Sequence, residues 1–240
     1  MDAAVEIRNL RVAFRTRAST VVALDDLTLS VESGHVVGFL GPNGAGKTTA
    51  MHVLLGFVEP TSGEARLFGR DVRESIARER IGYLPENPDT YRFLTARELL
   101  TFSGQLFRMS GRTLRDRVQQ LLDEMDLAAA ADRKLATYSR GMLQRVGLAQ
   151  SLVHNPDLLI LDEPTSGLDP IARVAVRQVI ARLRAAGKTV FFSSHELSEV
   201  ELVCDSLAIV SRGRLVAQGP AANLVAPGES LERFFMRVVQ

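Results

Sequence analysis

The residues from Gly41 to Thr48 follow the spacing G-x-x-x-x-G-K-T and lie between an apolar stretch and a helical pattern. Glycines at these positions allow successive backbone N–H groups to wrap closely around a phosphate, and a helix N-terminus adds partial positive charge. Lys47 would reach the β- and γ-phosphates of a nucleotide, and the Thr48 hydroxyl would bind Mg²⁺. The alternative is a glycine-rich turn without a ligand, which the lysine and both flanking elements disfavour. The candidate phosphate-binding residues are Gly41, Asn43, Gly44, Ala45, Gly46, Lys47, Thr48 and Thr49.

Two adjacent carboxylates, Asp162 and Glu163, follow the apolar residues 158–161, which we predict to be a buried strand. Ligands bind at the carboxyl ends of strands in open α/β sheets, so both acids would lie beside the nucleotide. One carboxylate can complete the Mg²⁺ shell while the next accepts a proton from an attacking water. Without the phosphate loop, two acids that open a turn would be the better interpretation. His195 likewise ends a predicted strand, 189–194, and the alternative there is an ordinary polar residue at a strand exit.

A second segment, 135–152, has a loop with Ser139 and Gly141 that is followed by a predicted helix. A serine hydroxyl, a glycine amide and a helix N-terminus together form a suitable site for a phosphate. One short chain would then contain two phosphate-binding segments that are far apart in sequence. Any function assigned to the chain has to explain this duplication.

The composition is that of a globular protein. With 240 residues, of which 46% are hydrophobic, the chain can bury a sizeable core. The formal net charge of +1 argues against binding to nucleic acid or to a membrane surface by bulk electrostatics. Cys204 is the single cysteine, which excludes an intrachain disulfide and fits a reducing compartment. The sequence starts without an apolar signal segment and has no apolar run long enough to span a bilayer, so we expect a soluble, cytoplasmic protein.

Strands and helices alternate along most of the chain, which predicts a mostly parallel sheet. The exception is the stretch from about Thr95 to Asn155, where the pattern is helical. Within it, apolar residues recur at the spacing of one helical face, at Leu114, Val118, Leu121, Leu122 and Met125. We therefore interpret this stretch as a helical insertion into an α/β core.

The second half of the chain carries clear signals for the ends of its elements. A helix over 171–186 is predicted to have Asp169 at its N-cap, Pro170 in its first turn and Gly187 just beyond its end. A hairpin is expected to turn at Arg212-Gly213, because the segments on either side have strand patterns. The last residues, SLERFFMRVVQ, predict an amphipathic helix.

The order of the motifs resembles that of the nucleotide-binding subunit of an ABC transporter over essentially the whole chain. The matching stretches are GPNGAGKT, YSRGMLQR, LLILDEP, SGLD and the histidine at a strand end. In that family two subunits face each other head to tail and enclose two ATP molecules, with Mg²⁺ at each site. The resemblance implies that Ser139 and Gly141 contact the γ-phosphate of the ATP held by the opposite subunit. The second phosphate-binding segment is then explained, because each subunit supplies half of each site.

The resemblance also implies roles for single residues. Asp162 would belong to the Mg²⁺ shell, and Glu163 would be the general base. Asp169 would lie in the loop that couples the two sites, and His195 would sense the γ-phosphate. Phe14 would stack on adenine, and the alternative for a phenylalanine in a strand is a place in the core.

Two loops depart from the family pattern. The first is the loop of residues 138–142, with Ser139 and Gly141, which we call the serine loop. It has Tyr138, Arg140 and Met142 where Leu, Gly and Gln are usual, which leaves the backbone conformation at Arg140 open. The loop that normally carries Gln has Glu86, which we place provisionally among the Mg²⁺ ligands. Both departures are similar to those of exporter cassettes in which a separate ATPase chain pairs with a separate permease.

The fold expected from these patterns and from the resemblance is α/β. It consists of a P-loop NTPase core with a mostly parallel sheet, an N-terminal antiparallel β part and an inserted helical subdomain. We expect one domain over residues 1–240. Its parts would be the core, 1–85 and 156–220, the helical insertion with the serine loop, 86–155, and a C-terminal helical tail, 221–240.

The resulting hypothesis is an ATPase that drives transport, with export as the expected direction. Its partners would be a second ATPase subunit, in a homodimer, and an integral membrane permease that binds it through residues 86–107 at the inner face of the cell membrane. No nucleic acid is expected as a partner. The alternative is a soluble ABC-type ATPase that acts as a mechanical switch in assembly or cell division. A P-loop kinase or GTPase is disfavoured, because no N-K-x-D guanine motif is present and the serine loop would have no purpose.

Overall fold

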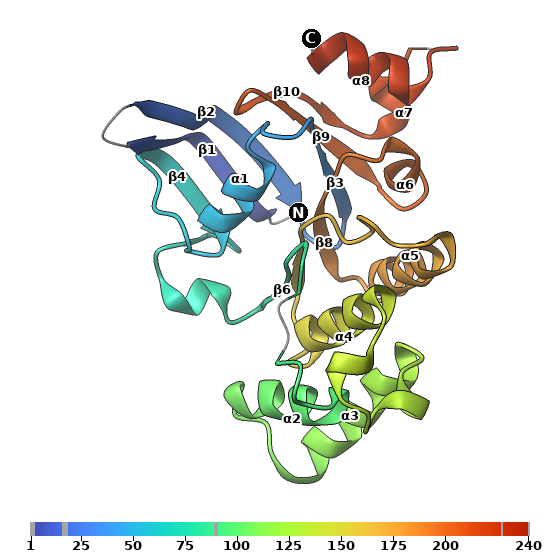
Figure 1. Cartoon of the computed structure of the whole chain (residues 1–240). Helices are drawn as coiled ribbons and strands as arrows, with labels where there is room; N and C mark the ends of the chain where they lie inside the picture. The colour runs from blue at the N-terminus through green and yellow to red at the C-terminus, as the bar shows by residue number, and fades with distance from the viewer. Residues whose placement is uncertain (1–2, 16–18, 89–90, 227, 240) are drawn as a thin grey trace.

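The computed structural model describes residues 3–15, 19–88, 91–226 and 228–239. Two β-sheets lie in the part of the molecule that also holds both termini, and a group of helices projects from it (Figure 1). None of the helices in the described ranges is both long and apolar enough to cross a bilayer.

The smaller sheet is antiparallel and comes from the N-terminal part of the chain. Its strand order is β2-β1-β4-β5. Buried and exposed residues alternate along much of β1 and β2, as expected for a sheet with one face against the core. The prediction of an N-terminal antiparallel β part is therefore confirmed. The strands are β1 (Ala3–Arg15), β2 (Thr20–Glu32), β4 (Ser62–Leu67) and β5 (Arg70–Asp71).

The larger sheet has the order β10-β9-β3-β8-β7-β6, and its strands run parallel except for the hairpin strand β10. Its central strands are buried along their whole length, which explains their continuous apolar sequences. The predicted hairpin turn is present, with Arg212 and Gly213 both at positive φ. The strands are β3 (Val36–Leu40), β6 (Ile81–Leu84), β7 (Leu158–Leu161), β8 (Thr189–Ser194), β9 (Ser206–Ser211) and β10 (Arg214–Gly219).

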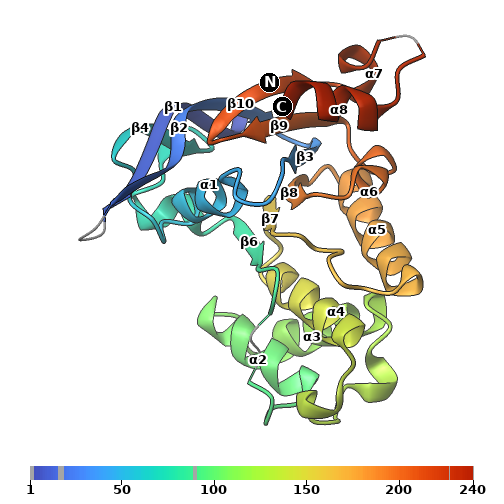
Figure 2. The ribbon, with the colours of Figure 1, turned by 45° about the horizontal axis from the view of Figure 1, so that its top comes forward.

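The two faces of the larger sheet belong to different cores. On one face, alternate residues such as Phe39, Ile160 and Phe191 pack with helix α1 (Lys47–Leu54) and with the inner face of the small sheet. Figure 2 shows α1 beneath the strands β1 and β2, close to β3. The other face packs against the later helices. The strands of the larger sheet therefore lie between two hydrophobic cores, and these cores fix the positions at which the loops after the strands begin.

Three α-helices lie between β6 and β7 in the described part of the chain, and the first two form the end of the molecule farthest from β10 in Figure 1. The predicted apolar face of the second of them is buried, from Leu114 to Met125. Thr95 starts the first with a capping box, in which its hydroxyl accepts a hydrogen bond from the Glu98 N–H and its own N–H donates to the Glu98 carboxylate. The helices are α2 (Ala96–Leu106), α3 (Gly111–Glu124) and α4 (Arg140–Leu152).

The remaining helices follow β7. Helix α5 starts one residue earlier than predicted, and the predicted N-cap is present, because the Asp169 carboxylate accepts a hydrogen bond of 2.9 Å from the Ala172 N–H. The amphipathic C-terminal helix packs Leu231 and Phe234 into the core. These helices are α5 (Pro170–Ala185), α6 (Leu197–Glu201), α7 (Ala221–Leu224) and α8 (Leu231–Val239), and short 3₁₀ turns occur at Ser75–Arg78, Ala128–Ala130 and Leu135–Thr137.

Candidate functional site

The loop between β3 and α1 leaves the first backbone N–H groups of α1 open. Gly46, at the N-cap of α1, has φ of 104°, and Gly44 has φ of 79°, conformations that favour glycine. No side chain caps the N-terminus of α1. A Cβ at Gly46 would lie 2.6 Å from the Ala23 carbonyl oxygen, so strand β2 also requires glycine there. The loop thus presents unpaired N–H groups and the positive end of the helix dipole to an anion.

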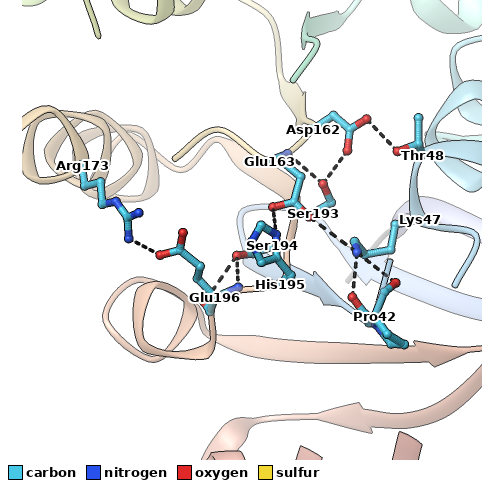
Figure 3. A network of polar contacts seen from close by, with 11 residues as sticks. Pro42, Lys47, Thr48, Asp162, Glu163, Arg173, Ser193, Ser194, His195 and Glu196 are labelled. Atoms are coloured by element: carbon cyan, nitrogen blue, oxygen red, sulfur yellow. Dashed lines mark hydrogen bonds and ion pairs between the residues drawn. The ribbon is translucent and has the colours of Figure 1, made fainter. Parts of the chain in front are cut away.

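Lys47 is enclosed by the loop to which it belongs. Its side chain is 7% exposed, and its ammonium group donates hydrogen bonds to the carbonyl oxygens of Gly41 at 2.7 Å and Pro42 at 3.4 Å. The same nitrogen lies 3.5 Å from a carboxylate oxygen of Glu163 (Figure 3). The cation is therefore held beside the open N–H groups by partners from the same chain.

Thr48 and Asp162 come from different elements and meet at the edge of the sheet. The Thr48 hydroxyl donates to one Asp162 carboxylate oxygen at 2.9 Å, and the Ser193 hydroxyl donates to the other at 2.6 Å. Hydroxyl and carboxylate oxygens are ligands that Mg²⁺ accepts. In the described ranges no three or more His, Cys, Asp or Glu side chains are arranged to hold a metal. The pair therefore fits an ion that takes most of its ligands from phosphate and water.

Glu163 connects the lysine to the histidine at the end of β8. One carboxylate oxygen faces Lys47, and the other lies 2.8 Å from Nδ1 of His195. The Glu163 backbone is in the left-handed region, with φ of 48°, and the Glu163 N–H donates to the Ser193 hydroxyl at 2.8 Å. A non-glycine residue in this conformation is strained, and such strain is concentrated at functional sites. The fold therefore holds the Glu163 carboxylate in one place between two cationic or polar partners.

A hollow of about 380 Å³ opens onto this cluster. It is bounded by the phosphate loop from Asn43 to Thr49, by Glu163 and His195, and also by Glu86. Glu86 thus faces the same space as the phosphate loop. Phe14 is not one of the lining residues; its side chain lies on β1 and is 44% exposed. Exposure argues against the core alternative for Phe14.

The other predicted residues gather at a second hollow, of about 470 Å³. Ser139, Gly141 and Asp169 all line it, and it shares no lining residue with the first hollow. Ser139 caps helix α4, because its hydroxyl oxygen accepts a hydrogen bond of 3.3 Å from the Met142 N–H. As a hydroxyl, Ser139 keeps its own hydrogen to donate elsewhere. Apart from Phe14, the predicted site residues therefore form two groups on one chain.

Comparison with known proteins shows the family to which the chain belongs. The family model described as ABC transporter matches residues 24–166, which is more than half of the chain. The chain belongs to the ABC transporter family. The predicted fold class and family are confirmed.

Relatives in this family are close in sequence. An uncharacterized ABC transporter ATP-binding protein of Nostoc sp. is 46% identical over 222 residues, which are 90% of this chain and 66% of that protein. The chain thus spans about two thirds of the length of this relative. The Nod factor export ATP-binding protein I of Paraburkholderia xenovorans is 39% identical over 227 residues, 94% of this chain and 73% of that protein.

Solved structures of ATP-binding cassettes have the same fold. The ATP-binding subunit of an ABC transporter superimposes with a TM-score of 0.87 at 30% identity, over 99% of this chain and 100% of that one. A dimeric cassette in a post-hydrolysis state, bound to ADP and Pi, has a TM-score of 0.82 at 25% identity, over 90% and 98% of the two chains. The dimer and the bound products belong to that protein.

The cassette contains polar residues in its site that sequence reasoning missed. Ser193 is fully buried on β8 and joins the Asp162 side chain to the Glu163 backbone, since it donates to the Asp162 carboxylate and accepts from the Glu163 N–H. Gln144 on α4 donates to the Pro164 carbonyl oxygen at 2.9 Å and so ties α4 to the loop after Glu163. A serine inside an apolar strand was the available signal for Ser193. Nothing local to Gln144 distinguishes it from other helix residues.

The structure also shows the contacts of Tyr138 and Arg140, two residues of the serine loop that differ from the family pattern. Tyr138 is buried, and its hydroxyl donates to the Ala130 carbonyl oxygen at 2.7 Å. Arg140 starts α4 with its guanidinium against Gly167, where a Cβ would lie 2.5 Å from Nη1. Arg140 therefore adopts an ordinary helical conformation, and the open question about its backbone is resolved.

The phenol of Tyr83, on β6, is a titratable neighbour of Asp162. Burial, together with the negative charge of Asp162, raises the pKa of Tyr83 on β6 to about 12. Tyr83 therefore remains a neutral hydrogen-bonding phenol throughout the physiological range.

Proposed function

We propose that this chain is the ATP-hydrolysing subunit of a membrane transporter, and that two copies act in a head-to-tail dimer with Mg²⁺. The observation that carries the proposal is the division of the candidate residues between two hollows with no common lining residue. One hollow is lined by Lys47, Glu163 and His195, and the other by Ser139, Gly141 and Asp169. A second copy in the reverse orientation would bring the two kinds of hollow together.

The first hollow would hold the triphosphate. Lys47 and the open N–H groups of α1 bind its β- and γ-phosphates, and Thr48, Asp162 and Glu86 face the ion. When bound, Mg²⁺ would neutralise charge on the phosphate oxygens. Glu163 accepts the proton of the attacking water, because Lys47 and His195 hold its carboxylate at the edge of the phosphate cradle.

The remaining residues hold and complete the site. His195 orients Glu163 and approaches the γ-phosphate from the strand end. The Ser139 hydroxyl donates to the γ-phosphate of the partner's ATP, together with the Gly141 amide. Asp169, which lines the same hollow, lies in the loop between the two sites. The exposed ring of Phe14 stacks on the adenine.

The permease would be a separate chain at the inner face of the membrane. Its contact surface includes residues 91–107, where the aromatic side chains of Tyr91, Phe93, Phe102 and Phe107 are exposed. Exposed apolar patches of this kind mark sites of protein association. Export is the direction supported by the relatives that are named Nod factor export ATP-binding proteins.

Glu163→Gln tests the shared site. This variant keeps the shape of the side chain but cannot take the proton, so ATP-driven closure is completed and reopening fails. On gel filtration with Mg-ATP we expect a stable dimer, whereas the wild type returns to monomer as ATP is consumed. Glu201→Gln, on the exposed surface of α6, is the matched control and should behave as the wild type. A Glu163→Gln protein that stays monomeric at high concentration with Mg-ATP would contradict the proposal.

A further inference from the structure

Arg173, in the first turns of α5, contacts two loops of the site at once. Its Nε donates a hydrogen bond of 3.0 Å to the Leu168 carbonyl oxygen. Its Nη1 forms an ion pair with the Glu196 carboxylate, which is drawn in Figure 3. The two side chains are 28% and 23% exposed, so the pair is partly shielded from water. One guanidinium thus joins residues 168 and 196, which belong to different loops.

The first loop is the one expected to meet the partner subunit. Leu168 directly precedes Asp169, which caps α5 and lines the hollow of the serine loop. The Leu168 side chain is buried, and its N–H is bonded to the Thr165 carbonyl oxygen. The Arg173 contact therefore fixes a short, well-anchored segment rather than a free surface loop.

The second loop carries His195. Glu196 follows the histidine directly, and its N–H donates to the Ser194 hydroxyl at 2.9 Å, which closes a tight turn around His195. At the centre of that turn, Nδ1 of His195 lies 2.8 Å from the Glu163 carboxylate. A displacement of the Glu196 carboxylate would therefore displace the histidine relative to Glu163.

We propose that Arg173 is a positioning residue that fixes the Asp169 loop and the His195 turn relative to each other. This proposal rests on the proposed function and adds a link inside one subunit between the partner-facing loop and the reaction centre. The planar guanidinium offers donors in two directions at fixed geometry, which a lysine ammonium on a flexible stem cannot reproduce. When a partner engages the Asp169 loop, Arg173 transmits a displacement of that loop to His195, and so to the contact between His195 and Glu163 that the single chain already makes.

Arg177 supplies a matched control. It lies one helical turn further along α5 and pairs with Glu199 of α6, at 2.7 and 2.9 Å to the two carboxylate oxygens. Both arginines therefore bridge the same two helical segments with an ion pair. The Arg177 pair is the more buried, since Glu199 is 9% exposed against 23% for Glu196. If the Arg173–Glu196 ion pair only stabilised the fold, Arg177→Met would change hydrogen exchange and kcat at least as much as Arg173→Met.

Hydrogen exchange on the nucleotide-free chain tests the link without reference to ATP hydrolysis. In Arg173→Met we expect faster exchange both in the peptide with the Leu168 amide and in the peptide with the Glu196 amide. In Arg177→Met both peptides should exchange as in the wild type. The proposal is overturned if one of the two peptides is unaffected by Arg173→Met, or if Arg177→Met has the same effect. This result stands whether or not the proposed function is correct.

Steady-state ATPase measurements then test the consequence for catalysis. Arg173→Met should lower kcat roughly 10- to 100-fold, the loss expected when a reacting group is misplaced by about an ångström. Its KM for ATP and its melting temperature should match those of Arg177→Met, and Arg173→Lys should recover only part of kcat.

In a His195→Ala background the Arg173→Met loss should disappear, because both changes act through the same group. Additive losses would refute action through His195, whereas an inactive wild type would refute the proposed function instead.

Discussion

The N-termini of α1 and α4, which are the two candidate phosphate-binding helix ends, are built in opposite ways. Helix α1 begins at a glycine without a side-chain cap, and the Lys47 beside it is almost fully enclosed. Helix α4 begins at Ser139, which caps its own helix, and both Ser139 and Arg140 are exposed. The first end is uncapped and lies beside an enclosed lysine, and the second is capped and exposed.

The difference indicates what each end requires from a ligand. The N-terminal N–H groups of α1 have no side-chain partner, so an anion there satisfies groups that the fold leaves open. Helix α4 already has its cap and gains little from an anion of its own. It offers a hydroxyl hydrogen and a positive helix end to an anion that another molecule presents. We therefore expect ATP to bind first at α1, and the bound triphosphate then to recruit α4 of a second copy.

The largest effect is expected from Lys47→Met, which removes the cation of the α1 end. Two hydrogen bonds of a charged donor are lost at the phosphates, which corresponds to a decrease in ATP affinity of about 10²- to 10⁴-fold. Titration calorimetry of the monomer with ATP measures it. Lys188→Met is the control, because Lys188 bonds Asn155 and Asp157 away from the hollow. Unchanged affinity in Lys47→Met would mean that the α1 end is not the primary ATP site.

Ser139→Asp separates the two roles of the α4 end. Aspartate is as good an N-cap as serine, so the fold should be retained, but its charge would repel the partner's γ-phosphate. ATP binding to the monomer should be unchanged, while the ATP-dependent dimer of Glu163→Gln should be lost in the double variant. Ser139→Ala, by contrast, should lower the free energy of unfolding by about 1 kcal/mol through loss of the cap. A large loss of monomer ATP affinity in Ser139→Asp would contradict the comparison, since it would assign Ser139 to the α1 site of its own chain.

The two ends also differ in how well they could be predicted. The α1 end is a local pattern, because eight consecutive residues contain the glycines, the lysine and the threonine. The α4 end could be located from Ser139 and the following helix, but the purpose of a second site followed only from the family resemblance. The alternation of strands and helices predicted the sheet, and the N-cap at Asp169 and the turn at Arg212-Gly213 were predicted to the residue.

What could not be predicted depends on contacts between segments distant in the chain. Ser193 meets Asp162 because β8 lies beside β7, and Arg173 meets Glu196 because α5 and α6 both contact β8. Neither neighbour can be inferred from periodicity, which specifies the buried face of an element but not the element opposite. The roles assigned to Phe14 and Glu86 remain predictions. Glu86 lines the hollow at the phosphate loop, whereas Phe14 does not.

The smallest effect, and the sharpest test of the difference, is expected at Arg140. A cation at the first residue of a helix opposes the helix dipole, at a cost of about 0.3–1 kcal/mol. Arg140→Gln should therefore raise the free energy of unfolding by about that amount, which is a rise in melting temperature of about 1–4 °C for a chain of this size. The same substitution removes a positive charge beside Ser139 that attracts the partner's triphosphate.

Arg140→Gln should accordingly make the fold more stable and the ATP-dependent dimer weaker. Thermal unfolding without nucleotide measures the first effect, and the ATP concentration for half-maximal dimerisation of the Glu163→Gln background measures the second. Arg133→Gln, at an exposed position ahead of the serine loop, is the control for a change in net charge. A loss of stability in Arg140→Gln would mean that the contact with Gly167 outweighs the dipole. The N-terminus of α4 would then be stabilised by a contact within its own chain, as Lys47 at the N-terminus of α1 is by the phosphate loop. The two helix ends would in that case differ less than their capping residues indicate.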